Sequence, residues 1–118
     1  MDETVIKKCA DHKFHPLNVT QIRVLLKKAH CNELKLNLED IDISRLDSLD
    51  GLFSYYDNCF LQKINIQAIS EWDVSHIKTM KKLFHYCDDF DGRLIESWNV
   101  SNVTDLESAF DGCMFSAN

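Results

Sequence analysis

The chain has 118 residues, about the size of one domain, and its 45% hydrophobic and 27% charged content is typical of globular proteins and excludes a disordered or collagen-like chain. Its net charge of −6 is uneven, because residues 1–37 carry seven Lys or Arg against four Asp or Glu, whereas residues 38–118 carry six against fifteen. Such an acidic body repels nucleic acids and anionic membranes, and it favours a protein partner with a basic surface.

Apolar stretches in the chain are short. They reach three residues, as in Val24-Leu25-Leu26, far below the roughly 18 residues of a membrane span or the roughly 7 to 15 of an export signal. We therefore expect no membrane contact and a cytoplasmic protein, or a cell-surface or secreted one if the chain is a piece of a longer protein.

The first element along the chain is a predicted helix that begins after Asn18 and ends near His30. Asn18 is suited to cap it, with Gln21 at the capping-box position. One face is apolar: Ile22, Leu25, Leu26 and Ala29. We expect residues 1–37 to form a capping segment that covers the repeats which follow.

Residues 38–118 contain three internal repeats. A shift of 26 positions aligns six identical pairs, and a shift of 31 positions aligns an earlier, third copy. The identical pairs are Ile69 with Ile95, Trp72 with Trp98, Val74 with Val100, Ser75 with Ser101, Phe84 with Phe110 and Cys87 with Cys113. A period of 20 to 50 residues is typical of solenoids. We number the repeats 1 (38–67), 2 (68–93) and 3 (94–118).

Each repeat combines a predicted strand with a predicted helix. The strands are 36–43, 68–74 and 94–100, which are rich in Ile, Val and Trp. The helices are 49–56, 80–87 and 106–113, which have apolar residues at i, i+3, i+4 and i+7 and follow the cap residues Ser48, Thr79 and Asp105. Residues 60–67 are expected to form an outer loop with a short strand. The predicted fold class is α+β, a short leucine-rich-repeat-like solenoid with an N-terminal helical cap.

Two tetrapeptides also carry a family resemblance. Trp72-Asp73-Val74-Ser75 and Trp98-Asn99-Val100-Ser101, each followed by a Phe and then a Cys, resemble the signature of BspA-like surface-protein repeats, also called Mycoplasma-type lipoprotein repeats. Repeat 1 departs from it, with Ile41 in place of the Trp. The resemblance implies a bacterial or bacteriophage-like origin, a leucine-rich-repeat fold, and binding in place of catalysis.

No residue pattern in the chain indicates catalysis or a cofactor. The five cysteines (Cys9, Cys31, Cys59, Cys87, Cys113) lack the paired spacing of a zinc site, so we expect buried free thiols. His85 is expected on a solvated face without a catalytic partner, and Asp88, Asp89 and Asp91 lack the spacing of a calcium loop. We therefore predict no enzyme, no catalytic or metal residue and no cofactor.

Repeated polar and aromatic positions have a structural interpretation. Trp72 and Trp98 are expected in the core. Asp42, Asp73 and Asn99 are expected, with the serines two residues later, to form stacked turns that satisfy backbone groups.

The function we predict is a non-enzymatic protein-binding module with an acidic surface that contacts a basic partner. The proposed contact residues share a negative charge on repeats 2 and 3: Glu71, Asp73, Asp88, Asp89, Asp91, Glu96, Asp105, Glu107 and Asp111. An alternative is a small intracellular inhibitor, of an anti-defence or anti-CRISPR type, that blocks a nucleic-acid-binding protein. Another explanation of the acidic surface is that it serves only to keep the protein soluble.

The end of repeat 3 suggests an interface. Trp98, Phe110 and Phe115 would be partly exposed on its end face, and exposed apolar patches mark interaction sites. We expect this face to form a homodimer with a two-fold axis, to bind a partner, or to continue into further repeats.

Overall fold

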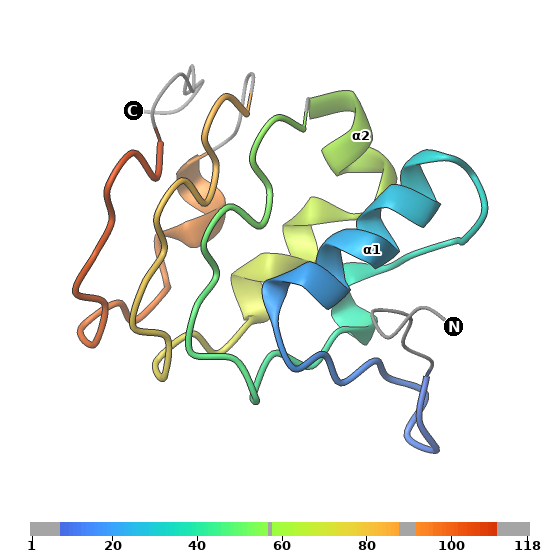
Figure 1. Ribbon diagram of the computed structural model, residues 1–118, viewed down its shortest axis with the longest axis horizontal. Helices are drawn as coiled ribbons and strands as arrows, with labels where there is room; N and C mark the ends of the chain where they lie inside the picture. Colours follow the sequence, from blue (N-terminus) through green and yellow to red (C-terminus); the bar gives the residue numbers. More distant parts are fainter. Residues whose placement is uncertain (1–7, 57, 88–91, 111–118) are drawn as a thin grey trace.

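The computed structural model describes residues 8–56, 58–87 and 92–110 (Figure 1). It contains two α-helices, α1 (Val19–His30) and α2 (Asn58–Lys63), and three 3-10 helices, η1 (Leu38–Asp40), η2 (Ile66–Glu71) and η3 (Gly92–Ile95). Isolated parallel bridges pair Phe14 with Ile41, Ser48 with Thr79, and Thr79 with Asp105. Within the described ranges there is no β-strand, and no helix is both long and apolar enough to cross a membrane.

Helix α1 forms where its cap and its apolar face predict it. The Asn18 side chain accepts a hydrogen bond from the Gln21 backbone N–H at 3.0 Å, and the Gln21 side chain accepts one from Leu17 N–H at 2.8 Å. The four predicted core residues of this helix are all buried. The helix, its cap and its buried face are therefore confirmed, whereas the assignment of residues 1–37 as a capping segment and the repeat boundaries stay predictions.

Hydrogen bonds between neighbouring repeats hold the rest of the chain together. We call residues 49–56, 79–87 and 105–110 the ladder segments. Alternate N–H groups of the first segment donate to carbonyls of the second: Leu49 to Thr79, Gly51 to Lys81, Phe53 to Leu83 and Tyr55 to His85, at 2.8 to 3.0 Å. The second donates likewise to the third: Met80 to Asp105, Lys82 to Glu107 and Phe84 to Ala109. The three segments lie side by side in Figure 1.

The predicted α+β leucine-rich-repeat-like solenoid is wrong, because the described residues contain no strand and the ladder segments are not helices. Between the ladder bonds each segment makes short turns, such as Leu52 N–H to the Leu49 carbonyl at 3.1 Å. Tyr55, Lys82 and Tyr86 have left-handed backbone conformations, with φ of 69°, 56° and 56°, which a right-handed helix does not contain.

The predicted strands also differ from the structure. The 3-10 helix η1 lies within the predicted strand 36–43, and η2 and η3 overlap the starts of the predicted strands 68–74 and 94–100. The expected loop and strand at 60–67 is helix α2 followed by the start of η2, because Phe60, Leu61 and Ile64 have a helical spacing and all three are buried.

The apolar register of the repeats nevertheless identifies the core. Leu49, Leu52, Met80 and Leu83 are all buried. The Phe53 ring stacks on Phe84 at 5.5 Å between centroids, and Phe84 stacks on Phe110 at 5.8 Å. Equivalent side chains of successive repeats thus pack on one another, which a regular offset between the ladder segments requires.

The two tryptophans join successive repeats through their indole N–H groups. Trp72 Nε1 donates to the Leu38 carbonyl at 3.3 Å, and Trp98 Nε1 donates to the Ile69 carbonyl at 2.8 Å. Trp98 is buried, with 8% of its surface exposed, and Trp72 is half-buried. Both rings belong to the core cluster or pack against it, as expected.

Cysteine and histidine placement corrects two expectations. Cys9, Cys31 and Cys59 are exposed free thiols, so the expected burial holds for Cys87 and not for these three, while Cys113 lies outside the described residues. His85 is buried and not solvated; its ring contacts Tyr55 and Tyr86 edge to face.

Arg23 of α1 closes the edge of the first ladder segment. Its guanidinium donates to the carbonyls of Gly51 and Leu52 and to Ser54 Oγ, and it lies over the Tyr56 ring at 5.3 Å. A single planar cation thereby contacts two backbone carbonyls and one hydroxyl at this edge.

Replacing this side chain tests the contact. We expect Arg23→Ala to lower the free energy of unfolding by about 2 kcal/mol, because several charge-assisted hydrogen bonds to backbone acceptors are lost. Urea denaturation measures the change. Lys27→Ala, an exposed cation on the same helix, is the control and should change stability by less than about 0.5 kcal/mol. Equal effects of the two substitutions would contradict the assigned role.

Candidate functional site

An open groove lies between repeats 1 and 2, beside η1 and η2. Its volume is about 900 Å³. The lining residues come from both repeats and from the N-terminal segment: Lys13, Glu39, Ile41, Asp42, Ile43, Ser44, Asn65, Gln67, Ala68, Ser70, Glu71, Trp72, Asp73 and His76. We call this feature the acidic groove.

Negative charge dominates the acidic groove. Glu39, Asp42, Glu71 and Asp73 contribute four carboxylates, against the single ammonium of Lys13. Glu39, Glu71 and Asp73 are exposed and Asp42 is half-buried. The half-buried Trp72 ring adds an aromatic surface beside Glu71 and Asp73. Carboxylates next to an aromatic ring suit a cationic side chain, which they attract by charge and by cation–π contact.

Turns at equivalent positions of the repeats fix two of these carboxylates. Asp42 Oδ1 accepts from Ser44 N–H at 2.9 Å. Asp73 Oδ1 accepts from Ser75 N–H at 3.0 Å and from Ser75 Oγ at 2.6 Å. In repeat 3, Asn99 Oδ1 accepts from Ser101 N–H at 3.1 Å. The predicted series of stacked turns is therefore confirmed.

The turns also keep the two carboxylates ionised. The Ser44 N–H, with smaller contributions from the Ser44 hydroxyl and from His15, lowers the pKa of Asp42. The Ser75 hydroxyl, followed by the Ser75 N–H, lowers the pKa of Asp73. Hydrogen bonds donated to a carboxylate favour its charged form. Both groups thus carry negative charge into the groove at neutral pH.

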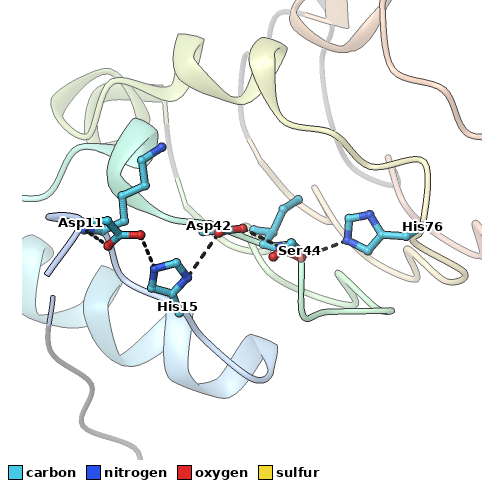
Figure 2. A network of polar contacts seen from close by, with 7 residues as sticks. Asp11, His15, Asp42, Ser44 and His76 are labelled. Atoms are coloured by element: carbon cyan, nitrogen blue, oxygen red, sulfur yellow. Dashed lines mark hydrogen bonds and ion pairs between the residues drawn. The ribbon is translucent and has the colours of Figure 1, made fainter. Parts of the chain in front are cut away.

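His15 joins the N-terminal segment to the turn of repeat 1, as Figure 2 shows. Its Nε2 lies 2.7 Å from Asp11 Oδ2, and its Nδ1 lies 3.2 Å from Asp42 Oδ2. The hydrogen bond with His15 lowers the pKa of Asp11. Two backbone hydrogen bonds join the same segments: Phe14 N–H donates to the Asp40 carbonyl, and Asp42 N–H donates to the Phe14 carbonyl. The N-terminal segment therefore fixes one wall of the acidic groove.

His76 fixes the opposite wall. Its Nε2 donates to the Ile43 carbonyl at 3.0 Å, across the boundary between repeats 2 and 1 (Figure 2). Together with the indole bond from Trp72 to the Leu38 carbonyl, this contact joins the two walls by side chains from repeat 2. The groove is thus formed by an inter-repeat contact and not by a mobile loop.

The proposed contact residues do not form one cluster. Glu71 and Asp73 line the acidic groove, whereas Glu96 and Glu107 are exposed on repeat 3. Asp105 accepts from Glu107 N–H and pairs with Lys81 at 3.4 Å. Asp88, Asp89, Asp91 and Asp111 lie outside the described residues.

Sequence reasoning missed Glu39 and the groove-facing side of Asp42. Glu39 aligns with Ser70 of repeat 2, so the repeat gives it no signal. Asp42 was expected to act only in a turn. Of the three end-face residues, Trp98 is buried, Phe110 is half-buried, and Phe115 lies outside the described residues. Trp98 therefore lacks the partial exposure that the end-face interface predicts for it.

The groups that line the groove offer no metal site. Across the described part of the chain, no cluster of three or more His, Cys, Asp or Glu residues is suited to hold a metal ion. The four carboxylates that line the acidic groove attract positive charge.

The lowered pKa of Asp42 makes a pH-dependent prediction. Its stabilisation is fully present above the pKa of an unfolded aspartate, about 4, and is lost as the pH falls through the lower folded-state pKa. Asp42→Asn keeps an acceptor for Ser44 N–H, as Asn99 does in repeat 3, but cannot titrate. We expect the unmodified protein to lose more unfolding free energy between about pH 7 and pH 3 than this variant loses.

Urea denaturation at both pH values measures the difference. The control is Asp47→Asn, which changes an exposed aspartate and should leave the pH dependence close to that of the unmodified protein. Identical pH dependence in all three proteins would exclude a stabilising role for the charged turn.

Comparisons with known proteins identify a family. No curated protein and no solved structure shows significant similarity to the chain. A family described as "Mycoplasma protein of unknown function, DUF285" matches residues 54–118. The match covers more than half of the chain, including all of repeats 2 and 3. The chain therefore belongs to the DUF285 family of Mycoplasma proteins of unknown function.

Proposed function

We propose that this protein is a non-enzymatic protein-binding module, and that the acidic groove binds a lysine- or arginine-bearing segment of a partner. One observation carries the proposal: four carboxylates and the Trp72 ring line a single groove that contains one lysine. A basic side chain in this groove gains Coulomb attraction from several directions and an aromatic contact.

The side chains of the groove are held in place, which supports specific binding of a basic segment over an acidic surface that serves only solubility. The carboxylates of Asp42 and Asp73 are held by their turns, and His15 and His76 fix the walls. A site whose polar groups are already in place loses little conformational entropy on binding. A surface whose acidity served only solubility would not need carboxylates fixed around an aromatic ring.

The resemblance to BspA-like surface-protein repeats points in the same direction. It rests on the two Trp-containing tetrapeptides of repeats 2 and 3, and surface proteins of this kind act by binding. We propose a BspA-like binding role as the finer assignment within the DUF285 family. The alternative of an inhibitor that blocks a nucleic-acid-binding protein stays a prediction from the acidic composition, and no feature of the groove favours it specifically.

Binding of a defined basic peptide tests the proposal. The probe is a synthetic peptide of alternating lysine and glycine, titrated into the full chain while tryptophan fluorescence is recorded. We expect saturable binding that weakens as the salt concentration rises, since exposed charges are screened beyond about 10 Å at 0.1 M salt. The double substitution Glu39→Gln and Glu71→Gln should weaken binding at least about fivefold, because two of the four carboxylates are neutralised.

A matched control separates the groove from overall charge. Glu96→Gln with Glu107→Gln removes the same charge from exposed positions of repeat 3, and it should change the affinity less than about twofold. Equal weakening by the two double substitutions would show non-specific attraction and overturn the proposal. So would affinity that is indifferent to salt.

A further inference from the structure

A second groove lies between α1 and the end of the first ladder segment, and its charge is opposite to that of the acidic groove. Its volume is about 480 Å³. The lining residues are Thr20, Arg23, Val24, Lys27, His30 and Tyr56. Arg23 and Lys27 are cations, His30 is a third basic side chain, and no carboxylate is among these lining residues. We call this feature the basic groove.

The helical period gathers the basic side chains on one face of α1. Thr20, Arg23, Lys27 and His30 follow one another at intervals of three or four residues, which places them on the same side of a helix. The helix contains no Asp or Glu, whereas residues 38–118 carry fifteen acidic residues against six Lys or Arg. The basic groove therefore concentrates positive charge on an otherwise acidic protein.

These side chains have no carboxylate partner in the described part of the chain. Within residues 8–56, 58–87 and 92–110, none of Arg23, Lys27 and His30 forms an ion pair with Asp or Glu. A half-buried or buried charge in a protein is normally paired with an opposite charge. The half-buried guanidinium of Arg23 meets only neutral acceptors there, so the groove lacks a counter-charge.

Arg23 also keeps donors in reserve. Its bonds to the carbonyls of Gly51 and Leu52 and to Ser54 Oγ are all made by Nη1. The N–H groups of Nε and Nη2 donate to no described residue. Nε and Nη2 belong to one planar fork, and such a fork matches the two oxygens of a carboxylate.

Aromatic and aliphatic side chains form the rest of the groove. Val24 and Tyr56 are half-buried, and the Arg23 guanidinium lies 5.3 Å from the centre of the Tyr56 ring. Tyr56 packs on Phe60 at 4.9 Å between centroids, and the His30 ring meets Phe60 edge to face at 5.0 Å. The basic side chains thus stand beside packed apolar surface, which suits an occupant that carries both a negative charge and an apolar group.

The charge of the whole protein decides between two kinds of anionic occupant. Its net charge of −6 repels a polyanion such as a nucleic acid, whose binding needs many phosphate contacts. A short peptide segment with one or two carboxylates meets only the local positive field, and its apolar side chains have a surface to cover. An acidic peptide therefore fits the groove better than a chain of phosphates.

We infer that the basic groove binds an acidic segment of a partner protein, in which a glutamate or aspartate lies next to an apolar residue. One carboxylate accepts from Nε and Nη2 of Arg23, and the charges of Lys27 and His30 attract a second. The apolar side chain of the segment covers Val24 and Tyr56. This interaction is independent of the proposed function of the acidic groove, because it draws on other residues and on the opposite charge.

A short peptide of alternating glutamate and leucine, blocked at both ends, tests the inference. It is titrated into the full, ¹⁵N-labelled chain while the side-chain Nε–H signals of the arginines are followed by NMR. We expect a saturable downfield shift at Arg23 and none at Arg45 or Arg93. The affinity should fall as the salt concentration rises. A peptide of alternating glutamine and leucine should give no such shift, because it lacks the carboxylates.

Two substitutions with the same change of charge separate the groove from the overall charge. Lys27→Glu should weaken peptide binding at least about fivefold, because attraction at the groove becomes repulsion. Lys78→Glu replaces an exposed cation of repeat 2 and should change the affinity less than about twofold. Since both lysines are exposed, circular dichroism should show both variants folded. Arg23 is observed and not replaced, because its Nη1 bonds also hold the first ladder segment.

Four results would overturn the inference. The first is no shift of the Arg23 Nε–H signal at about millimolar peptide. The second is equal weakening of binding by Lys27→Glu and Lys78→Glu. The third is saturation of the same shift by inorganic phosphate at a lower concentration than by the peptide, which would assign the groove to a phosphate group. The fourth is self-association in sedimentation velocity that Lys27→Glu abolishes, which would assign it to a second copy.

Discussion

The structure depends on a directional set of backbone hydrogen bonds between repeats. Alternate N–H groups of each ladder segment donate to carbonyls of the next repeat, from Leu49 through Tyr55 and again from Met80 through Phe84. Within the ladder segments these bonds point the same way along the stack, whereas just before the segments Lys78 N–H donates to the Asp47 carbonyl and Thr104 N–H donates to the Lys78 carbonyl in the opposite direction. As a result, one side of every ladder segment offers donors and the other offers acceptors. The side-chain register follows, because each bond places equivalent phenylalanines over one another.

This direction explains why the two ends of the stack differ. At the first repeat, Arg23 of α1 donates to the part-buried carbonyls of Gly51 and Leu52. Buried carbonyls without partners are costly, so the position of α1 has a physical cause beyond coverage of apolar side chains. At repeat 3, the Leu106 and Ser108 N–H groups, which are equivalent to the Met80 and Lys82 donors, make no hydrogen bond within residues 8–56, 58–87 and 92–110. Elements η1 and η2 also lie against each other, and the turns of Asp42 and Asp73 line one groove beside them.

The sequence predicts some features of this structure and not others. The Asn18 cap and the buried face of α1 are local, and sequence reasoning predicts them correctly. The repeat register predicts which side chains are buried, such as Phe53 and Phe84. It does not predict the element type, because an apolar spacing of i, i+3, i+4 and i+7 arises both in a helix and in a chain of short turns. Left-handed positions occupied by Tyr55 and Tyr86 and not by glycine hide the difference.

The acidic groove is a long-range feature, and sequence reasoning reaches only part of it. Glu71 and Asp73 stand out as charges in the repeat signature. Glu39 aligns with a serine in repeat 2, and Asp42 has a sufficient local role in its turn. The contact of His15 with Asp42 depends on the path of the N-terminal segment, which no spacing in the sequence specifies. The inter-repeat bonds therefore decide both the fold and the site, and they are directly measurable. Scalar couplings across hydrogen bonds, recorded by NMR, should connect the Phe53 amide nitrogen to the Leu83 carbonyl carbon and Phe84 to Ala109. Couplings from Phe53 to Leu49 and from Phe84 to Met80, four residues earlier as in an α-helix, would contradict the account.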